Sequence, residues 1–149
     1  CKIDIKNDKI TIESSGILKS CGFIETATYP GFSTDLQAQM LALQTICSGT
    51  SIIKENLFET RFKFVPELKK MGANIIVNQQ TACIFSEKKL LGADVYATDL
   101  RGGAALVLAG LCAEGYTTVN NVFHIDRGYA NLEEKLSSLG AKIKRISGE

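Results

Sequence analysis

Two acid–arginine pairs are the residues of this sequence whose types and spacing best suit chemistry. Asp35 and Asp99 each follow a threonine at the start of a predicted helix. Arg61 and Arg127 follow these acids at similar distances along the chain, and Arg101 lies in the first turn of the helix that begins at Asp99. A positioned carboxylate can take a proton from a weak nucleophile, and the donor fork of arginine fits carboxylate and phosphate oxygens. Together these residues predict a cleft for an anionic substrate.

Each of these residues also has a structural explanation. At a helix start the threonine hydroxyl can cap free N–H groups, and the acid that follows it complements the helix dipole. Thr34 with Gln37 even fits a capping box. An arginine can belong to a structural pair, such as Asp126 with Arg127, or extend into solvent. Capping is the simpler explanation of either acid alone, but the loop before Asp35 favours a site, because ligands of α/β proteins bind at strand-to-helix loops.

The remaining reactive residues predict neither a metal site nor a cofactor. The five cysteines are scattered without a Cys-x-x-Cys pair, and His124, the single histidine, cannot complete a zinc set. The sequence contains neither of two glycine-rich phosphate-binding motifs, G-x-x-x-x-G-K-[ST] and G-x-G-x-x-G. Scattered cysteines in apolar patterns are typical of small buried side chains in a reducing cytosol, so we expect a cytoplasmic protein.

Composition predicts a soluble globular protein. Of the 149 residues 45% are hydrophobic and the net charge is +1, which excludes disorder and argues against a nucleic-acid surface. The longest apolar stretch, 104–113, is shorter than the roughly 20 residues of a membrane span. The start shows no leader pattern. Because the chain opens on Cys1 with a strand pattern already running, we expect a piece of a longer protein, with neither nucleic acid nor membrane as a partner.

The elements that must position these residues alternate between strands and helices. Residues 1–22 predict a hairpin around Asn7-Asp8, residues 23–90 a complete β-α-β-α-β-β unit, and residues 91–149 a second copy of it. The expected helices cover 35–47, 66–71, 99–114 and 131–139, and a last strand covers 142–146.

Three matched segments in the same order support an internal duplication. Residues 34–36 recur at 98–100, residues 60–61 are echoed at 126–127, and residues 71–75 at 139–143. The opening hairpin then corresponds to the tail of an earlier copy. The helix from 104 to 113 is apolar on every side, which predicts that protein surrounds it. The predicted fold class is α/β (α+β), built of repeated units with their helices packed inside.

Four blocks of the sequence resemble those of one group of enolpyruvyl transferases, the UDP-N-acetylglucosamine 1-carboxyvinyltransferases. They are PGFSTDLQAQ at 30–39, FETRF at 58–62, ATDLR at 97–101 and HIDRGY at 124–129, in the family's order and spacing. The last block is not expected of the related shikimate-pathway enzymes. The resemblance implies transfer of enolpyruvyl from phosphoenolpyruvate to the 3′-hydroxyl of UDP-N-acetylglucosamine, the first committed step of bacterial peptidoglycan synthesis. It also implies the family's inside-out barrel, whose two domains each hold three β-α-β-α-β-β units.

The same blocks imply roles for particular residues. Asp35 corresponds to the acid that contacts the sugar hydroxyl and is proposed as its base, and Leu57 falls where a backbone group touches the UDP-sugar. Arg127 matches a phosphoenolpyruvate-binding arginine. Other active-site groups around the substrates are matched by Arg61, Asp99 and Arg101. The family supplies the acid that protonates the methylene carbon from a mobile loop of its other domain, and none of the five cysteines here lies in that motif.

The resemblance therefore implies the C-terminal part of such an enzyme, with half an active site, inactive alone and completed by the N-terminal remainder. One alternative from another class is a non-catalytic repeat module that binds an anion or a partner protein. Another is an enolpyruvyl transferase with a phosphorylated acceptor, which would prefer shikimate 3-phosphate.

Overall fold

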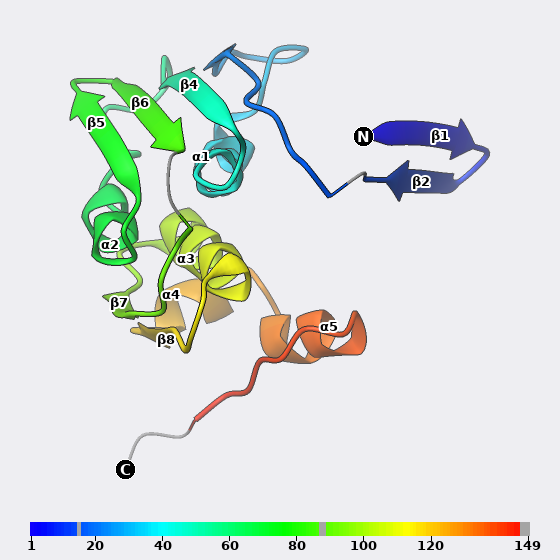
Figure 1. Cartoon of the computed structure of the whole chain (residues 1–149), viewed down its shortest axis with the longest axis vertical. Coiled ribbons are helices and arrows are strands. Elements are labelled where there is room, and N and C mark those ends of the chain that lie inside the picture. The colour runs from blue at the N-terminus through cyan, green and yellow to red at the C-terminus, as the bar shows by residue number, and fades with distance from the viewer. Residues whose placement is uncertain (15, 87–88, 147–149) are drawn as a thin grey trace.

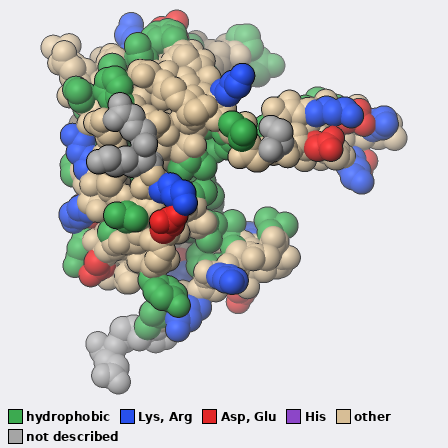
Figure 2. All heavy atoms as spheres, in the orientation of Figure 1, with side chains coloured by type: hydrophobic (Ala, Val, Ile, Leu, Met, Phe, Trp, Pro, Cys, Tyr) green, Lys and Arg blue, Asp and Glu red, His purple; other side chains and the backbone are tan. Residues whose placement is uncertain are grey.

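The chain begins with a hairpin that stands apart from the rest of the molecule. The computed structural model describes residues 1–14, 16–86 and 89–146 (Figure 1). Strands β1 (Lys2–Lys6) and β2 (Lys9–Glu13) pair antiparallel, and Asn7 takes the left-handed conformation (φ 53°) that the tight turn requires. The predicted hairpin is confirmed. Figure 2 shows it extending away from the body, with every residue of both strands exposed.

A four-stranded sheet forms the first half of the body. Its strands are β3 (Phe23–Glu25), β4 (Gly49–Lys54), β5 (Asn74–Asn78) and β6 (Thr81–Ser86), in the spatial order β3-β4-β6-β5. β3 runs parallel to β4, and β6 is antiparallel to both β4 and β5. Ile53 and Ile84 are buried on the face of the sheet that packs on the core.

Two helical segments accompany this sheet. A 3₁₀ turn, η1 (Thr34–Leu36), leads directly into α1 (Gln37–Gln44), so the predicted helix at 35–47 is confirmed with a tighter start and an earlier end. Helix α2 (Val65–Lys70) has Pro66 in its first turn and ends before Gly72, whose φ of 89° favours glycine.

The second half contains a smaller sheet and three helices. β7 (Asp94–Tyr96) pairs parallel with β8 (Thr118–Asn120), and the helices are α3 (Leu100–Cys112), α4 (Phe123–Asp126) and α5 (Leu132–Ser138). Helix α4 was not expected from the sequence. The strand expected at 142–146 is wrong: these residues form no strand, because no neighbouring strand of the described chain lies beside them to share hydrogen bonds.

The core lies where α1 and α3 pack together and meet the sheet (Figure 1). Leu41 of α1, Phe64 and Leu106 of α3 are fully buried there. α3 approaches Phe64 so closely that a Cβ on Gly102 would lie 2.7 Å from the Phe64 Cβ, which glycine avoids. The first half of α3 is enclosed as expected, whereas Leu108 and Leu111 remain 37% and 39% exposed, so this chain does not surround the helix completely.

The α/β fold class is confirmed by this mixture of sheets and helices. Residues 23–86 follow the order strand, helix, strand, helix, strand, strand. That 23–90 and 91–149 are copies of one unit stays a prediction. Among the described residues, no helix has the length and apolarity to cross a bilayer.

Candidate active site

The structure brings three of the predicted site residues together: Asp35 in η1 just before α1, Arg101 in the first turn of α3, and Arg61 between β4 and α2. The Nε and Nη2 atoms of Arg101 each lie 2.6 Å from Oδ1 of Asp35, and Nη2 of Arg61 lies 3.8 Å from the same oxygen. Arg61 is mostly buried, with its guanidinium 4.4 Å from the centre of the Phe58 ring, a cation–π contact. The Asp35 side chain is 60% exposed, and its Oδ2 accepts no hydrogen bond from a described residue. Asp35 thus presents one free carboxylate oxygen beside two positive charges.

Asp99 caps a helix, unlike Asp35. Its Oδ1 accepts hydrogen bonds of 2.9 Å from the N–H groups of Arg101 and Gly102, so the carboxylate caps α3. The capping explanation therefore holds for Asp99, with the carboxylate rather than the Thr98 hydroxyl as the cap. By fixing the first turn of α3, Asp99 orients the backbone from which Arg101 reaches Asp35.

The capping box expected at Thr34 and Gln37 is wrong. Ser33 caps η1, accepting from the Asp35 N–H at 3.2 Å. The Thr34 hydroxyl instead donates to Oε2 of Glu55 at 2.9 Å. Glu55 is fully buried, a competing acceptor that local sequence does not reveal.

Leu57 lies in the loop that follows β4, and its side chain is 40% exposed. The Leu57 N–H donates to Oε1 of Glu55 at 2.9 Å. The backbone group of Leu57 that remains for a ligand is therefore its carbonyl.

Arg127 follows α4 and is exposed. Its side chain forms no ion pair with any described residue. Its neighbours nevertheless contact both central helices. Tyr129 OH accepts a hydrogen bond of 2.8 Å from Gln39 of α1, and a Cβ on Gly128 would lie 2.8 Å from Leu100 at the start of α3. The segment carrying Arg127 is thus held against the helices that carry Asp35 and Arg101.

Asp126 pairs with Arg145, not with Arg127 as the structural alternative suggested. The Nη1 and Nη2 atoms of Arg145 contact the two Asp126 oxygens at 2.9 and 2.7 Å, and its Nε contacts Glu133 at 2.7 Å. This fork fastens the segment after α5 to α4 and α5. It also leaves Arg127 without a competing acid next to it in sequence.

Replacing Arg145 by Gln is expected to destabilise the fold at neutral pH and much less in acid. Hydrogen bonds from Arg145 hold the pKa values of Asp126 and Glu133 below their ordinary range. A carboxyl with a lowered folded pKa stabilises the fold at pH above its unfolded value of about 4, and this stabilisation disappears as the pH falls through the folded value. Urea denaturation of wild type and Arg145→Gln should therefore give a difference that is constant above about pH 6 and vanishes at lower pH. A difference that does not change with pH would contradict this assignment.

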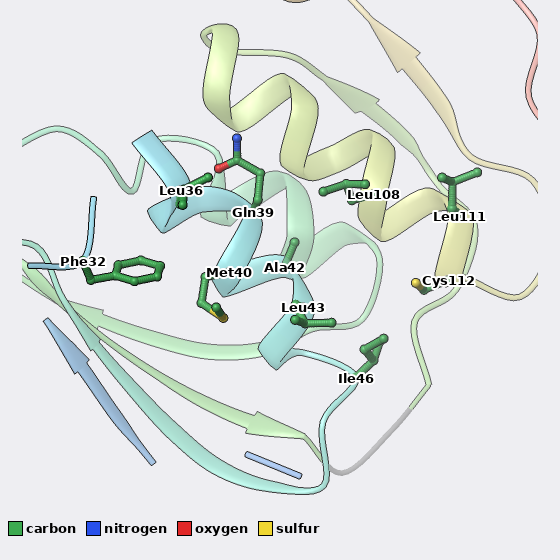
Figure 3. Close-up of a pocket in the computed structure, with 10 residues that line it drawn as sticks. All are labelled: Phe32, Leu36, Gln39, Met40, Ala42, Leu43, Ile46, Leu108, Leu111 and Cys112. Carbon is green, nitrogen blue, oxygen red and sulfur yellow. The ribbon is translucent and has the colours of Figure 1, made fainter. Parts of the chain in front are cut away.

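An apolar hollow of about 390 Å³ lies on the outer side of α1 and α3. Figure 3 shows Met40 and Leu43 on α1, with Leu108 and Leu111 on α3, around this space. Cys112 also lines it and is exposed, so the buried position expected for this cysteine is wrong. Partial desolvation nevertheless raises the pKa of its thiol, which keeps it in the less nucleophilic protonated form. The hollow is chemically unlike the arginine cluster and does not suit an anionic substrate.

The arginine cluster can bind an anion and remove a proton nearby. Arg61 and Arg101 outnumber Asp35, so the cluster keeps a positive charge that favours phosphate or carboxylate. No set of three or more His, Cys, Asp or Glu within residues 1–14, 16–86 and 89–146 is arranged to hold a metal ion.

The family match and the structural neighbours of this fold are enolpyruvyl transferases. The family model of EPSP synthase (3-phosphoshikimate 1-carboxyvinyltransferase) matches residues 1–136, and the chain belongs to this family. The enolpyruvyl transferase NikO from Streptomyces tendae superimposes on 99% of the chain with a TM-score of 0.86 and 30% identity, over 34% of its own length. EPSP synthase from Acinetobacter baumannii shares the fold, with a TM-score of 0.63 at 18% identity over 97% of the chain and 35% of its own.

Relatives that are more similar to this chain in sequence are named for one particular enolpyruvyl transfer reaction. UDP-N-acetylglucosamine 1-carboxyvinyltransferase 1 of Caldanaerobacter subterraneus subsp. tengcongensis is 52% identical over 146 residues, which is 97% of this chain and 35% of that protein. The UDP-N-acetylglucosamine 1-carboxyvinyltransferase of Sulfurimonas denitrificans is also 52% identical, over 97% of this chain and 34% of its own. The chain spans about a third of the length of the curated relatives it matches.

Proposed function

We propose that this chain is the C-terminal part of an enzyme that transfers enolpyruvyl from phosphoenolpyruvate to the 3′-hydroxyl of UDP-N-acetylglucosamine. The observation that carries the proposal is the Asp35 carboxylate held by Arg101 beside Arg61, in a chain that shares half its residues with relatives of that name. The same proposal makes the enzyme cytoplasmic and assigns it to the first committed step of peptidoglycan synthesis, and so to cell wall biogenesis, cell shape and cell division.

The proposed chemistry uses the cluster in two ways. Asp35 takes the proton of the sugar hydroxyl as its oxygen bonds to C2 of phosphoenolpyruvate, while an acid outside the groups assigned here protonates C3. Loss of phosphate and of a C3 proton then restores the double bond. Arg61, Arg101 and Arg127 surround the phosphate and carboxylate of phosphoenolpyruvate, so that the charge of the leaving phosphate is stabilised in place.

The proposal is tested by measuring phosphate release by the complete protein that contains this chain, which is called the full-length enzyme below. We expect release with phosphoenolpyruvate and UDP-N-acetylglucosamine together and none with either alone. Shikimate 3-phosphate in place of the UDP-sugar should give none, and preference for it would replace the proposed acceptor.

The isolated 149-residue chain is expected to release no phosphate, because the proposal gives it only part of the site. Adding the separately expressed remainder should restore release. Turnover by the isolated chain would contradict the partial-site proposal. A full-length protein that binds anions without turnover would favour a non-catalytic binding module.

A further inference from the structure

The Glu55 carboxylate is a fully buried polar group that the proposed chemistry leaves unexplained. It is 0% exposed and follows β4, at the start of the loop that contains Leu57. No ion pair of the described residues includes it. Burying a carboxylate without a cation is costly unless hydrogen bonds replace its hydration. Its hydrogen bonds therefore indicate what the fold gains from it.

Four donors converge on this carboxylate. Oε1 accepts from the Thr26 hydroxyl at 2.8 Å, the Leu57 N–H at 2.9 Å and the Phe58 N–H at 3.2 Å. Oε2 accepts from the Thr34 hydroxyl at 2.9 Å. Carboxylate oxygens accept hydrogen bonds without donating, so Glu55 can satisfy all four of these donors at once.

Two of the segments held by Glu55 carry site residues on separate parts of the chain. Thr34 immediately precedes Asp35 in η1, so its bond fixes the turn from which the carboxylate of Asp35 extends. The bonds from Leu57 and Phe58 fix the loop that contains Leu57 and whose Phe58 ring packs on Arg61. Glu55 itself, being fully buried, touches no substrate.

We propose that Glu55 is a positioning residue, which holds from the buried side both the turn bearing Asp35 and the loop that contacts the UDP-sugar. This inference rests on the proposed function. Glu55 then has two sets of hydrogen bonds, called here its two branches. The bond from Thr34 positions the proposed base, and the bonds from Leu57 and Phe58 position the sugar-binding loop.

Steady-state kinetics of the full-length enzyme can separate the two branches. Thr34→Val keeps the shape of the side chain and removes only its hydroxyl bond, so we expect kcat to fall about tenfold with both KM values unchanged. Glu55→Ala releases both branches, so kcat should fall about 100-fold and KM for UDP-N-acetylglucosamine should rise, with KM for phosphoenolpyruvate unchanged.

Two further variants separate positioning from general loss of stability. Thr45→Val removes a buried hydroxyl that bonds the Ala42 carbonyl at 2.6 Å at the far end of α1, and should lower Tm as much as Thr34→Val without changing kcat. Glu55→Gln keeps one oxygen for three of the donors, so it should recover most of the activity lost in Glu55→Ala. If Glu55→Ala does not fold, Thr34→Val with its control Thr45→Val still carries the test.

The outcomes distinguish this inference from the proposed function. Wild-type kcat in Thr34→Val, or a KM for the UDP-sugar that does not change in a folded Glu55→Ala, would overturn the positioning role and leave the proposed function intact. Absence of turnover in the wild-type enzyme would overturn the proposed function, and the role of Glu55 with it.

Discussion

Replacing Asp35 by Asn is expected to lower kcat of the full-length enzyme by about 10²- to 10⁴-fold, the usual contribution of a general base. Asn has nearly the shape of Asp, and its amide oxygen can still accept from Arg101 in place of Oδ1. Asn cannot take the sugar proton at the second oxygen, which in Asp35 accepts no hydrogen bond from a described residue. KM for both substrates should therefore change little. Phosphate release under saturating substrates measures the loss.

The matched control is Asp8→Asn in the turn of the β1–β2 hairpin, where the side chain is also exposed to solvent. Both variants should unfold at nearly the wild-type temperature, because exposed charges contribute little to stability. A kcat of Asp35→Asn within about threefold of wild type would show that another group takes the proton.

The elements of this fold were predictable where local pattern determines them. The hairpin follows from strict alternation around Asn7-Asp8, since Asn tolerates the left-handed turn. Helix α2 follows from Pro66 at its start and Gly72 after its end. The prediction of a strand at 142–146 was wrong because alternation of apolar and polar residues gives a segment only a tendency to form a strand. A strand forms only when a partner lies alongside, and pairing depends on the rest of the fold.

The candidate site was predictable as a set of residues but not as an arrangement. The repeat pattern pairs Asp35 with Arg61 and Asp99 with Arg127. In the structure Arg101, from the other half of the chain, lies 2.6 Å from Asp35, while Arg61 lies 3.8 Å away. This pairing arises because the starts of α1 and α3 meet, which is a consequence of helix packing rather than of spacing along the sequence.

Glu55 shows what sequence reasoning missed altogether. Its neighbours Lys54 and Asn56 make Glu55 typical of an exposed polar loop. Glu55 is instead buried among hydrogen-bond donors from Thr26, Thr34 and its own loop. The weak local signal is an acid directly after a strand with one buried face. That signal gains meaning only when Thr26 and Thr34 are known to lie beside it.

Replacing Arg127 by Gln is expected to lower kcat/KM for phosphoenolpyruvate about 100-fold. Arginine can make two charge-assisted hydrogen bonds to a phosphate or carboxylate, each contributing about 1.5–3 kcal/mol, and 1.4 kcal/mol corresponds to a factor of ten. The side chain is exposed and has no ion-pair partner among the described residues, so its loss should leave Tm unchanged. Arg127→Lys keeps the charge without the fork and should fall between wild type and Arg127→Gln.

Lys135→Gln on α5 is the matched control, because it removes one exposed positive charge from the same half of the chain. It should leave kcat/KM for phosphoenolpyruvate unchanged if the effect of Arg127 is a direct contact rather than a general attraction of anions. The identity of the affected substrate decides the assignment. If Arg127→Gln raised KM for UDP-N-acetylglucosamine instead, the exposed guanidinium would serve the diphosphate of the nucleotide. Arg61 and Arg101 would then be the arginines left to hold phosphoenolpyruvate, because they already lie beside Asp35.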